Sequence, residues 1–264
     1  MDKDNVDSTD PLKLFSEERK ARIQGYAENR DLREAADAFN VSANRHQYTY
    51  NFEWLGRPVI QFPQDLMALQ EIIWQVKPDL IIETGIAHGG SLIFSASMLA
   101  LLDLTEGRLE TDKGHQERKV LGIDIDIRDH NKRAIENHPL SSRIQMIQGS
   151  SIDHEIVELV NNVSKSYKKV MVILDSNHTH DHVLAELELY APMTSVGSYC
   201  VVFDTIVEDL PADMYPDRPW GPGNNPKTAV HKYLTTHTEF EIDKRIQNKI
   251  QITVAPDGYL KRLK

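Results

Sequence analysis

The chain has 264 residues, a length that suits one large domain or one domain with an added segment. Hydrophobic residues make up 40% and charged residues 27%, with 13 Gly and 12 Pro, which excludes collagen-like, low-complexity and fully disordered chains. The 40 acidic residues outnumber the 30 basic ones, and the resulting net charge of -10 argues against nucleic acid or an anionic membrane as the partner.

Three features indicate the compartment. Residues 1–10 lack the basic start and the apolar centre of a secretory signal. The apolar run at residues 93–102 is too short to span a bilayer. The single cysteine, Cys200, has no partner for an intrachain disulfide, and its apolar neighbours are typical of a buried strand. We therefore expect a cytoplasmic protein without a membrane span.

The first part of the chain predicts an extension. Residues 1–15 are polar and rich in Asp, so we expect them to be poorly ordered. Helix-forming residues predict a helix over 16–39. Aromatic residues mixed with Gly and Pro over 48–63 predict an irregular connector. Its Phe52 and Trp54 either cover a ligand or pack the extension onto the core.

The middle of the chain alternates helical patterns with short apolar runs. Hydrophobic residues at helical spacing predict an amphipathic helix over 64–77. Buried strands are predicted at 79–84, 119–126, 143–149, 169–175 and 198–204. Helices are predicted near 90–102, 129–137, 152–164 and 179–190. This repetition predicts an α/β fold with a doubly wound, mostly parallel sheet and right-handed crossovers.

The last part of the chain adds an antiparallel edge. A Pro/Gly-rich loop over 210–226 and a helix near 227–236 precede two strand-like pieces, 240–244 and 249–255, which we expect to pair antiparallel. The sheet then has seven strands, unlike the all-parallel sheet of nicotinamide-binding proteins. We divide the chain into an N-terminal extension and lid, residues 1–63, and a main domain, residues 64–264.

The first predicted strand runs into a glycine-bearing turn. In open α/β sheets ligands bind beyond the carboxyl ends of the strands, and here the residues are ETGIAHGGS, 83–91. Glycines let the backbone approach a ligand, and a helix N-terminus offers free N–H groups. The turn does not match the dinucleotide pattern GxGxxG. Glu83 instead precedes the first glycine, where it suits the amino-acid end of S-adenosylmethionine. A plain strand–helix connection is the alternative.

The second and third strands also end in polar residues. Asp124 is placed to accept both hydroxyls of a ribose, and Asp126 is the alternative for this role or a cap of the next helix. The third strand ends at Gly149, Ser150 and Ser151, which either flank an adenine ring or cap a helix.

The fourth and fifth strands carry candidates for catalysis. Asp175 and Asp204 end strands that we expect to be neighbours, so both carboxylates can bind one hard cation such as Mg²⁺. His178 follows in the turn and can act as a general base. His180 and His182 are more typical of a solvated helix start. In the long loop 209–226, Trp220 can stack on a sugar and Asn224 or Asn225 can bind hydroxyls, or the loop is a rigid surface segment.

These motifs together resemble one known family. ExGxxxGGS, GIDID, ILDSNH with AELxxYAP, GSYCVVFDT and WGPGxNP resemble the cephalosporin hydroxylase and rhamnosyl O-methyltransferase family over roughly residues 52–254. That family is similar to class I S-adenosylmethionine-dependent methyltransferases, whose fold is Rossmann-like. It is also similar in layout to the metal-dependent O-methyltransferases of macrolide sugars and catechol.

The resemblance implies site residues. Its cofactor positions fall on Glu83, Gly85, Ser91, Asp124, Gly149, Ser150 and Ser151. We also expect Gly89 and Asp175 to bind the cofactor. Its metal positions fall on Asp175 and Asp204, and its base falls on His178. Relatives often present two adjacent metal ligands where this chain has Phe203 before Asp204. Either Thr205, Glu208 or water fills the gap, or His178 and the two aspartates act without a metal.

The resulting hypothesis is methyl transfer from S-adenosylmethionine to a hydroxyl of a sugar or glycosylated small molecule, assisted by a divalent cation and His178. One alternative is a non-haem iron oxygenase that uses two of His178, His180 and His182 with Asp175 or Asp181. Another is a nucleotide-binding partner protein without catalysis. The N-terminal helix and exposed aromatics also favour a homo-oligomer. The sequence does not identify the acceptor.

Overall fold

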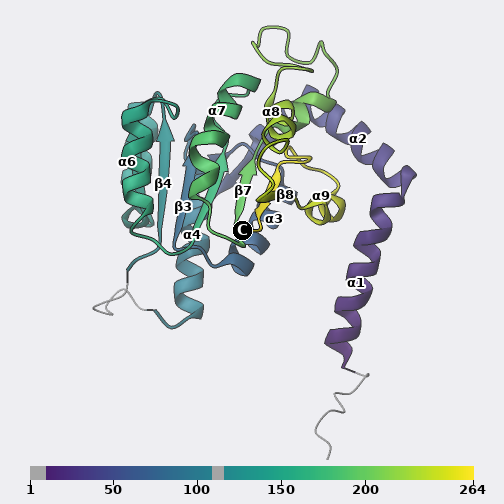
Figure 1. The fold of residues 1–264 in the computed structure, drawn as a ribbon, viewed down its shortest axis with the longest axis horizontal. Coiled ribbons are helices and arrows are strands. Elements are labelled where there is room, and N and C mark those ends of the chain that lie inside the picture. Colours follow the sequence, from purple (N-terminus) through teal and green to yellow (C-terminus); the bar gives the residue numbers. More distant parts are fainter. Residues whose placement is uncertain (1–9, 109–115) are drawn as a thin grey trace, which may run out of the picture.

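The structure, a computed structural model, describes residues 10–108 and 116–264. Seven strands form one sheet in the order β5-β4-β3-β6-β7-β9-β8 (Figure 1). Their bounds are β3 Leu80–Thr84, β4 Lys119–Asp124, β5 Ile144–Gln148, β6 Val170–Leu174, β7 Tyr199–Val202, β8 Phe240–Ile242 and β9 Tyr259–Arg262. Strands β3 to β7 pair in parallel, and β9 is antiparallel to both β7 and β8. The predicted α/β fold with a mostly parallel seven-stranded sheet is confirmed.

Helices cover both faces of the sheet (Figure 1). The helices on one face are α3 (Pro63–Val76), α4 (Gly90–Thr105) and α5 (Asp129–Glu136), and those on the other are α6 (His154–Ser164), α7 (His180–Tyr190) and α8 (Pro226–Tyr233). Successive strand residues alternate between the two cores: Ile81 packs on the first face, and Leu80 and Ile82 pack on the second. Strands buried on both faces are nearly continuous apolar runs, which made them visible in the sequence.

The N-terminal extension forms two helices where one was predicted. These are α1 (Pro11–Glu28) and α2 (Arg30–Arg45). The side chain of Asp10 caps α1, and Asn29 ends α1 and caps α2 by accepting from the Leu32 N–H at 3.0 Å. The expected disorder up to residue 15 is therefore wrong from Pro11 onward, and residues 1–9 lie outside the described residues. Helix α1 buries no side chain and contacts α9.

The connector between the extension and α3 packs against the core. It contains a short 3-10 turn and a two-stranded antiparallel hairpin, η1 Tyr48–Asn51, β1 Phe52–Trp54 and β2 Arg57–Val59. The Trp54 ring lies 4.9 Å from the Phe94 ring, and its N–H donates to Ser97 Oγ at 3.0 Å. For Trp54, packing onto the core is the outcome that the structure supports.

The C-terminal segment differs from the prediction. Residues 249–255 do not form a strand, because α9 occupies Lys244–Ile250 and the last strand, β9, begins only at Tyr259. An antiparallel pair at the edge is present, but β8 pairs with β9. The remaining short turns are η2 Ser141–Arg143, η3 Ala191–Met193 and η4 Thr205–Asp209. Among the described helices, none combines the length and apolar character that crossing a bilayer requires.

A buried carboxylate explains this difference. Asp65 on α3 is fully buried and accepts from the Val254 N–H at 2.9 Å and from the Tyr259 hydroxyl at 2.7 Å. Burial raises the pKa of Asp65 to about 6, although these hydrogen bonds oppose the rise. The backbone around Val254 is thus bound by a side chain instead of a neighbouring strand. At the start of α9, the Asp243 carboxylate accepts from the Arg245 N–H at 3.2 Å.

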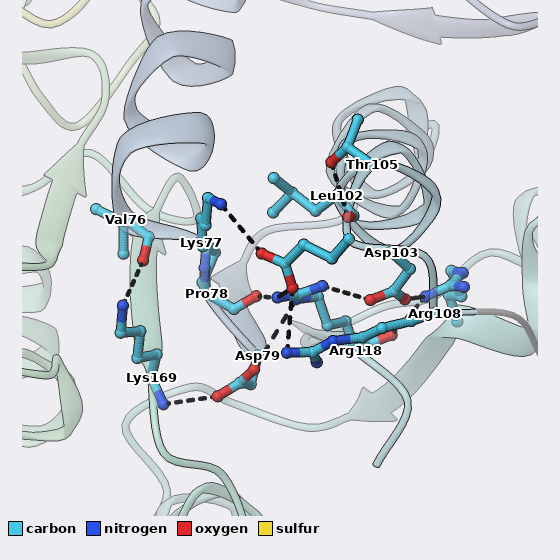
Figure 2. Close-up of polar contacts among 12 residues, drawn as sticks. Val76, Lys77, Pro78, Asp79, Leu102, Asp103, Thr105, Arg108, Arg118 and Lys169 are labelled. Atoms are coloured by element: carbon cyan, nitrogen blue, oxygen red, sulfur yellow. Dashed lines mark hydrogen bonds and ion pairs between the residues drawn. The ribbon is translucent and has the colours of Figure 1, made fainter. Parts of the chain in front are cut away.

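A network of buried charges lies at the N-terminal ends of strands β3, β4 and β5 (Figure 2). Arg118, only 2% exposed, donates to Asp103 at the end of α4, to Glu106 at 2.9 Å and to the Pro78 carbonyl at 3.1 Å. The second oxygen of Asp103 accepts from Arg143 at 2.6 Å. These bonds join α4 to the segments that lead into β3, β4 and β5.

We expect Asp103→Asn to lower the free energy of unfolding by about 3–5 kcal/mol, because Arg143 would stay buried without a compensating charge and Arg118 would lose one of its carboxylate partners. Urea unfolding followed by circular dichroism measures this change. The matched control is Glu34→Gln, which removes an exposed pair with Arg30 and should change the stability by less than about 0.5 kcal/mol. Similar losses in both variants would contradict the assignment.

Candidate active site

The order of the strands creates the site. The chain passes from β3 outward to β4 and β5, then returns to place β6 on the other side of β3. The carboxyl ends of β3 and β6 therefore meet where the order reverses, which is where such sheets bind ligands. The Asp175 N–H donates to the Thr84 carbonyl at 2.9 Å. Gly85 has φ 92, and a Cβ there would overlap the Asp175 carbonyl, so this approach requires glycine.

Side chains from three elements hold the turn after β3. Asp124 Oδ2 accepts from two backbone N–H groups of the turn at 2.8 and 3.3 Å. Asn131 on α5 donates to the Ala87 carbonyl at 2.8 Å, and Arg57 on β2 donates twice to the His88 carbonyl at 3.0 and 2.5 Å. Ala87 has φ 45, a left-handed conformation that these bonds stabilise. The turn is thus built before any ligand binds.

Two cavities open on either side of this turn. The larger has a volume of about 240 Å³ and is lined by predicted cofactor residues, namely Gly85, Asp124, Ser150, Ser151 and Asp175. The smaller, about 40 Å³, lies between the turn and the connector and includes Gly85, Gly89, Ser91 and Asp175. Two predicted residues line neither cavity: Gly149 bonds the Asp124 carbonyl through its N–H at 2.8 Å, and Glu83 lies within β3.

Asp126 does not cap the next helix, and it is less well placed than Asp124 for the ribose. It is exposed and lies outside both cavity linings. Helix α5 begins at Asp129, and no side chain caps it. Asp124, which borders the larger cavity, is therefore the better placed of the two carboxylates.

Glu83 is a buried carboxylate that suits a cationic ligand. It is 1% exposed, and burial raises its pKa to about 7 against the opposing hydrogen bond from Ser91. Within the part of the chain that the structure describes, Glu83 Oε2 meets no hydrogen-bond donor. Leaving a buried acceptor unpaired costs about 1–3 kcal/mol of stability, so a hydrogen bond from a ligand donor would be favourable here.

Asp175, His178 and Asp204 come together at the ends of β6 and β7. One potential ligand atom from each lies within 4.8 Å of the others, and His178 Nε2 is 3.1 Å from Asp204 Oδ2. Burial, followed by the negative charges of Asp204, Glu83 and Glu186, raises the pKa of Asp175 well above its ordinary value. Two carboxylates and an imidazole surrounded by negative charge are a donor set that fits a divalent cation.

Several predicted ligands point elsewhere. The Thr205 hydroxyl donates to the Pro256 carbonyl at 2.6 Å, and Phe203 is buried in the core. Glu208 accepts from the Gly223 N–H at 2.7 Å and from Asn225. Thr205 and Glu208 therefore do not complete the cluster in this structure.

The asparagines of the long loop make structural hydrogen bonds. Asn225 caps α8 by accepting from the Lys227 and Thr228 N–H groups, and Asn224 Oδ1 accepts from the His180 N–H at 2.9 Å. Asn225 is buried and engaged in this cap, whereas Asn224 is exposed and its role toward a substrate hydroxyl stays a prediction.

Trp220 lies beside the cluster of Asp175, His178 and Asp204, the acidic cluster. Its ring centre is 5.4 Å from that of His178 and 4.9 Å from that of Tyr215, and the Tyr215 hydroxyl donates to Asn44 on α2 at 2.9 Å. The loop thus presents two aromatic rings at the cluster, and α2 holds one of them in place.

The sequence interpretation missed two functional candidates. His182 lines the larger cavity, with Nε2 3.1 Å from Ser151 Oγ and 3.3 Å from Ser176 Oγ. Its spacing of four residues from the fully buried Glu186 on α7 was the available signal. Gln61 donates to Asp175 Oδ2 at 3.1 Å across 114 residues, and no local pattern marks that contact.

The remaining histidines do not build an iron site. His180 Nδ1 lies 2.8 Å from Thr228 Oγ1, and His182 faces serines. In residues 10–108 and 116–264, His178 alone joins Asp175 and Asp204 in a cluster able to hold a metal. The pair of histidines that the oxygenase hypothesis needs is therefore not assembled.

The Gly85 contact predicts a sharp difference between two glycines of similar backbone conformation. Gly56 has φ 83 with open space around it, so Gly56→Ala should cost only the strain of a left-handed alanine, about 1–2 kcal/mol. Gly85→Ala should cost about 1–3 kcal/mol more, because β3 and the Asp175 backbone must separate. Urea unfolding of both variants measures the difference, and equal losses would contradict it.

Comparisons with known proteins identify the family of this chain. The family model described as Rhamnosyl O-methyltransferase/CmcI matches residues 46–263. The chain is 30% identical over 233 residues to the rhamnosyl O-methyltransferase of Mycobacterium tuberculosis, covering 84% of this chain and 85% of that protein. The Mycobacterium leprae protein of the same name is 29% identical over 232 residues, covering 84% and 91%. A solved CmcI structure with Mg and SAM shares the fold, with a TM-score of 0.52, 18% identity and coverage of 81% and 78%. The chain therefore belongs to the rhamnosyl O-methyltransferase/CmcI family.

Proposed function

We propose that this chain is an S-adenosylmethionine-dependent O-methyltransferase acting on a hydroxyl of a sugar or a glycosylated small molecule. The family and the name of its mycobacterial relatives support the reaction class. The observation that carries the proposal is the position of Asp175, which lines both cavities at the glycine turn and also belongs to the cluster with His178 and Asp204. A methyl donor in the cavities and a hydroxyl at the cluster would meet at this residue.

The cofactor is assigned to the two cavities. Glu83 would accept from the ammonium group, and Gly85, Gly89 and Ser91 would surround the amino-acid end in the smaller cavity. Asp124 would bind the ribose, and the turn formed by Gly149, Ser150 and Ser151 would flank the adenine in the larger cavity. The sulfonium and ammonium of the cofactor bring positive charge to a group of carboxylates whose negative charges, after burial, raise the pKa of Asp175.

The acidic cluster is assigned to the acceptor hydroxyl. Asp175 and Asp204 would hold a divalent cation, which lowers the pKa of a hydroxyl bound to it. His178 would remove the hydroxyl proton, and the acceptor would be held in line with the methyl group by proximity. The rings of Trp220 and Tyr215, beside His178, would form an apolar wall for the face of a sugar. In this proposal residues 1–63 form an extension that supports this wall through Asn44.

Calorimetric titration of chelator-treated protein tests the cofactor assignment. We expect S-adenosylmethionine and S-adenosylhomocysteine to bind with micromolar affinity, and NAD and 2-oxoglutarate not to bind, with and without added Mg²⁺. Binding of 2-oxoglutarate alone would favour an oxygenase. Cofactor binding without transfer to any of a broad panel of acceptors would instead favour the non-catalytic partner protein.

We expect His178→Ala to lower turnover by roughly 10²–10⁴-fold, because the general base is lost, while the affinity for S-adenosylhomocysteine changes little. The matched control is His180→Ala, since His180 bonds Thr228 outside the cluster. Titration of the His178 variant with Mg²⁺ separates two roles: unchanged metal affinity supports a base, and lost affinity assigns His178 as a third metal ligand. Full turnover in this variant would remove His178 from the mechanism.

A further inference from the structure

The connector places one neutral amide inside the acidic site. Gln61 lies just before α3, is 3% exposed and lines the smaller cavity together with the glycine turn and Asp175. Its Nε2 donates to Asp175 Oδ2 at 3.1 Å. Among the described residues, its Oε1 meets no hydrogen-bond donor although it is buried.

The neighbouring backbone fixes the position of Gln61. A Cβ on Gly90 would overlap the Pro58 carbonyl and lie 2.8 Å from Val59 Cα, so the connector is pressed against the start of α4. Arg57 ties the same stretch to the His88 carbonyl. With its backbone held at this distance, the Gln61 side chain reaches Asp175 and the cavity together.

The polarity of the amide is set by its neighbour. In the structure the NH₂ group of Gln61 faces Asp175 and donates to it, so Oε1 points away from this carboxyl group. Among the described residues two buried oxygens then lack donors: Gln61 Oε1, on a residue that lines the smaller cavity, and Glu83 Oε2, two residues before Gly85. An ammonium group carries three donors, and it is the ligand group that satisfies two such acceptors.

We propose that Gln61 links the cofactor cavity to the cluster of Asp175, His178 and Asp204. Its NH₂ group positions Asp175, and its Oε1 accepts a hydrogen bond from the ammonium of the bound cofactor. This inference rests on the proposed function. A glutamine suits the task because it donates to one partner and accepts from the other. A glutamate at this place would add a further negative charge beside Asp175, Glu83 and Asp204.

The test compares two ligands that differ in one group, S-adenosylhomocysteine and its analogue without the α-amino group. For each variant, calorimetry gives the dissociation constant of the analogue divided by that of S-adenosylhomocysteine. Because a hydrogen bond to a charged group is lost, we expect Gln61→Met to reduce this ratio by about tenfold or more relative to the unmodified protein. A ratio that stays unchanged in Gln61→Met overturns the ammonium contact.

Gln64→Met is the matched control. Gln64 lies three residues further on, and its Oε1 is likewise buried without a donor in the described structure, but it lies outside the lining of the smaller cavity. We expect this variant to keep the ratio of the unmodified protein. A fall as large as that of Gln61→Met would attribute the effect to general disturbance of α3 and overturn the inference.

Gln61→Glu keeps the acceptor and removes the NH₂ donor. We expect this variant to retain the preference for the ligand with the amino group, which also keeps the test decisive if Gln61→Met fails to fold. Loss of the preference in Gln61→Glu would overturn the inference. For the contact with Asp175, Mg²⁺ titration of the S-adenosylhomocysteine complex should show several-fold weaker binding in Gln61→Met than in Gln64→Met, and equal affinities would overturn that half.

The two proposals fail in different ways. If S-adenosylhomocysteine does not bind the unmodified protein, the proposed function is wrong and this inference falls with it. If it binds and Gln61→Met keeps the full preference for the amino group, the proposed function stands and the role of Gln61 alone is wrong.

Discussion

The close approach of Gly85 to the Asp175 backbone determines where the other groups of the site lie. It brings the ends of β3 and β6 into contact, which leaves room for a cavity on each side of the turn. Asp175 then has to face both cavities and the neighbouring end of β7, where Asp204 follows. A side chain at position 85 would push these ends apart, so one glycine couples the topology of the sheet to the chemistry at its edge.

In the part of the chain that the structure describes, buried charges are compensated at the N-terminal ends of the strands but not at their C-terminal ends. At the N-terminal ends, Asp103 is compensated by Arg118 and Arg143, so the charges there hold the fold together. At the C-terminal ends, no Lys or Arg within the described ranges pairs with Glu83 or Asp175, and carboxylates there raise the pKa of Asp175. The first arrangement serves stability, whereas the second gains stability only when cations bind, which links ligand binding to folding.

The sequence predicted the parts of the molecule whose causes are local. Strands buried on both faces are apolar runs, and the residues at or just beyond their carboxyl ends, such as Asp124, Asp175 and Asp204, had to lie on the same side of the sheet. The strand expected at 249–255 failed because the distant Asp65 binds the backbone there, a contact that no local pattern encodes. Gln61 was missed for the same reason, since it meets Asp175 from 114 residues away. Thr205 sits beside Asp204, but its hydroxyl turns to Pro256, a direction set by tertiary packing.

The cofactor half and the acceptor half of the proposed site are formed by different kinds of structural element. The sheet, the glycine turn and the strand ends form the first, and their geometry follows from strand pairing. The second consists of Trp220 and Tyr215 on a long loop, held by a hydrogen bond from Tyr215 to Asn44 in the N-terminal extension. Loops and appended helices can change without disturbing a sheet, so the acceptor can differ among relatives that keep the same transfer chemistry. Gln61 stands at the junction, because its segment connects the extension to the first helix of the sheet domain and its side chain enters the site.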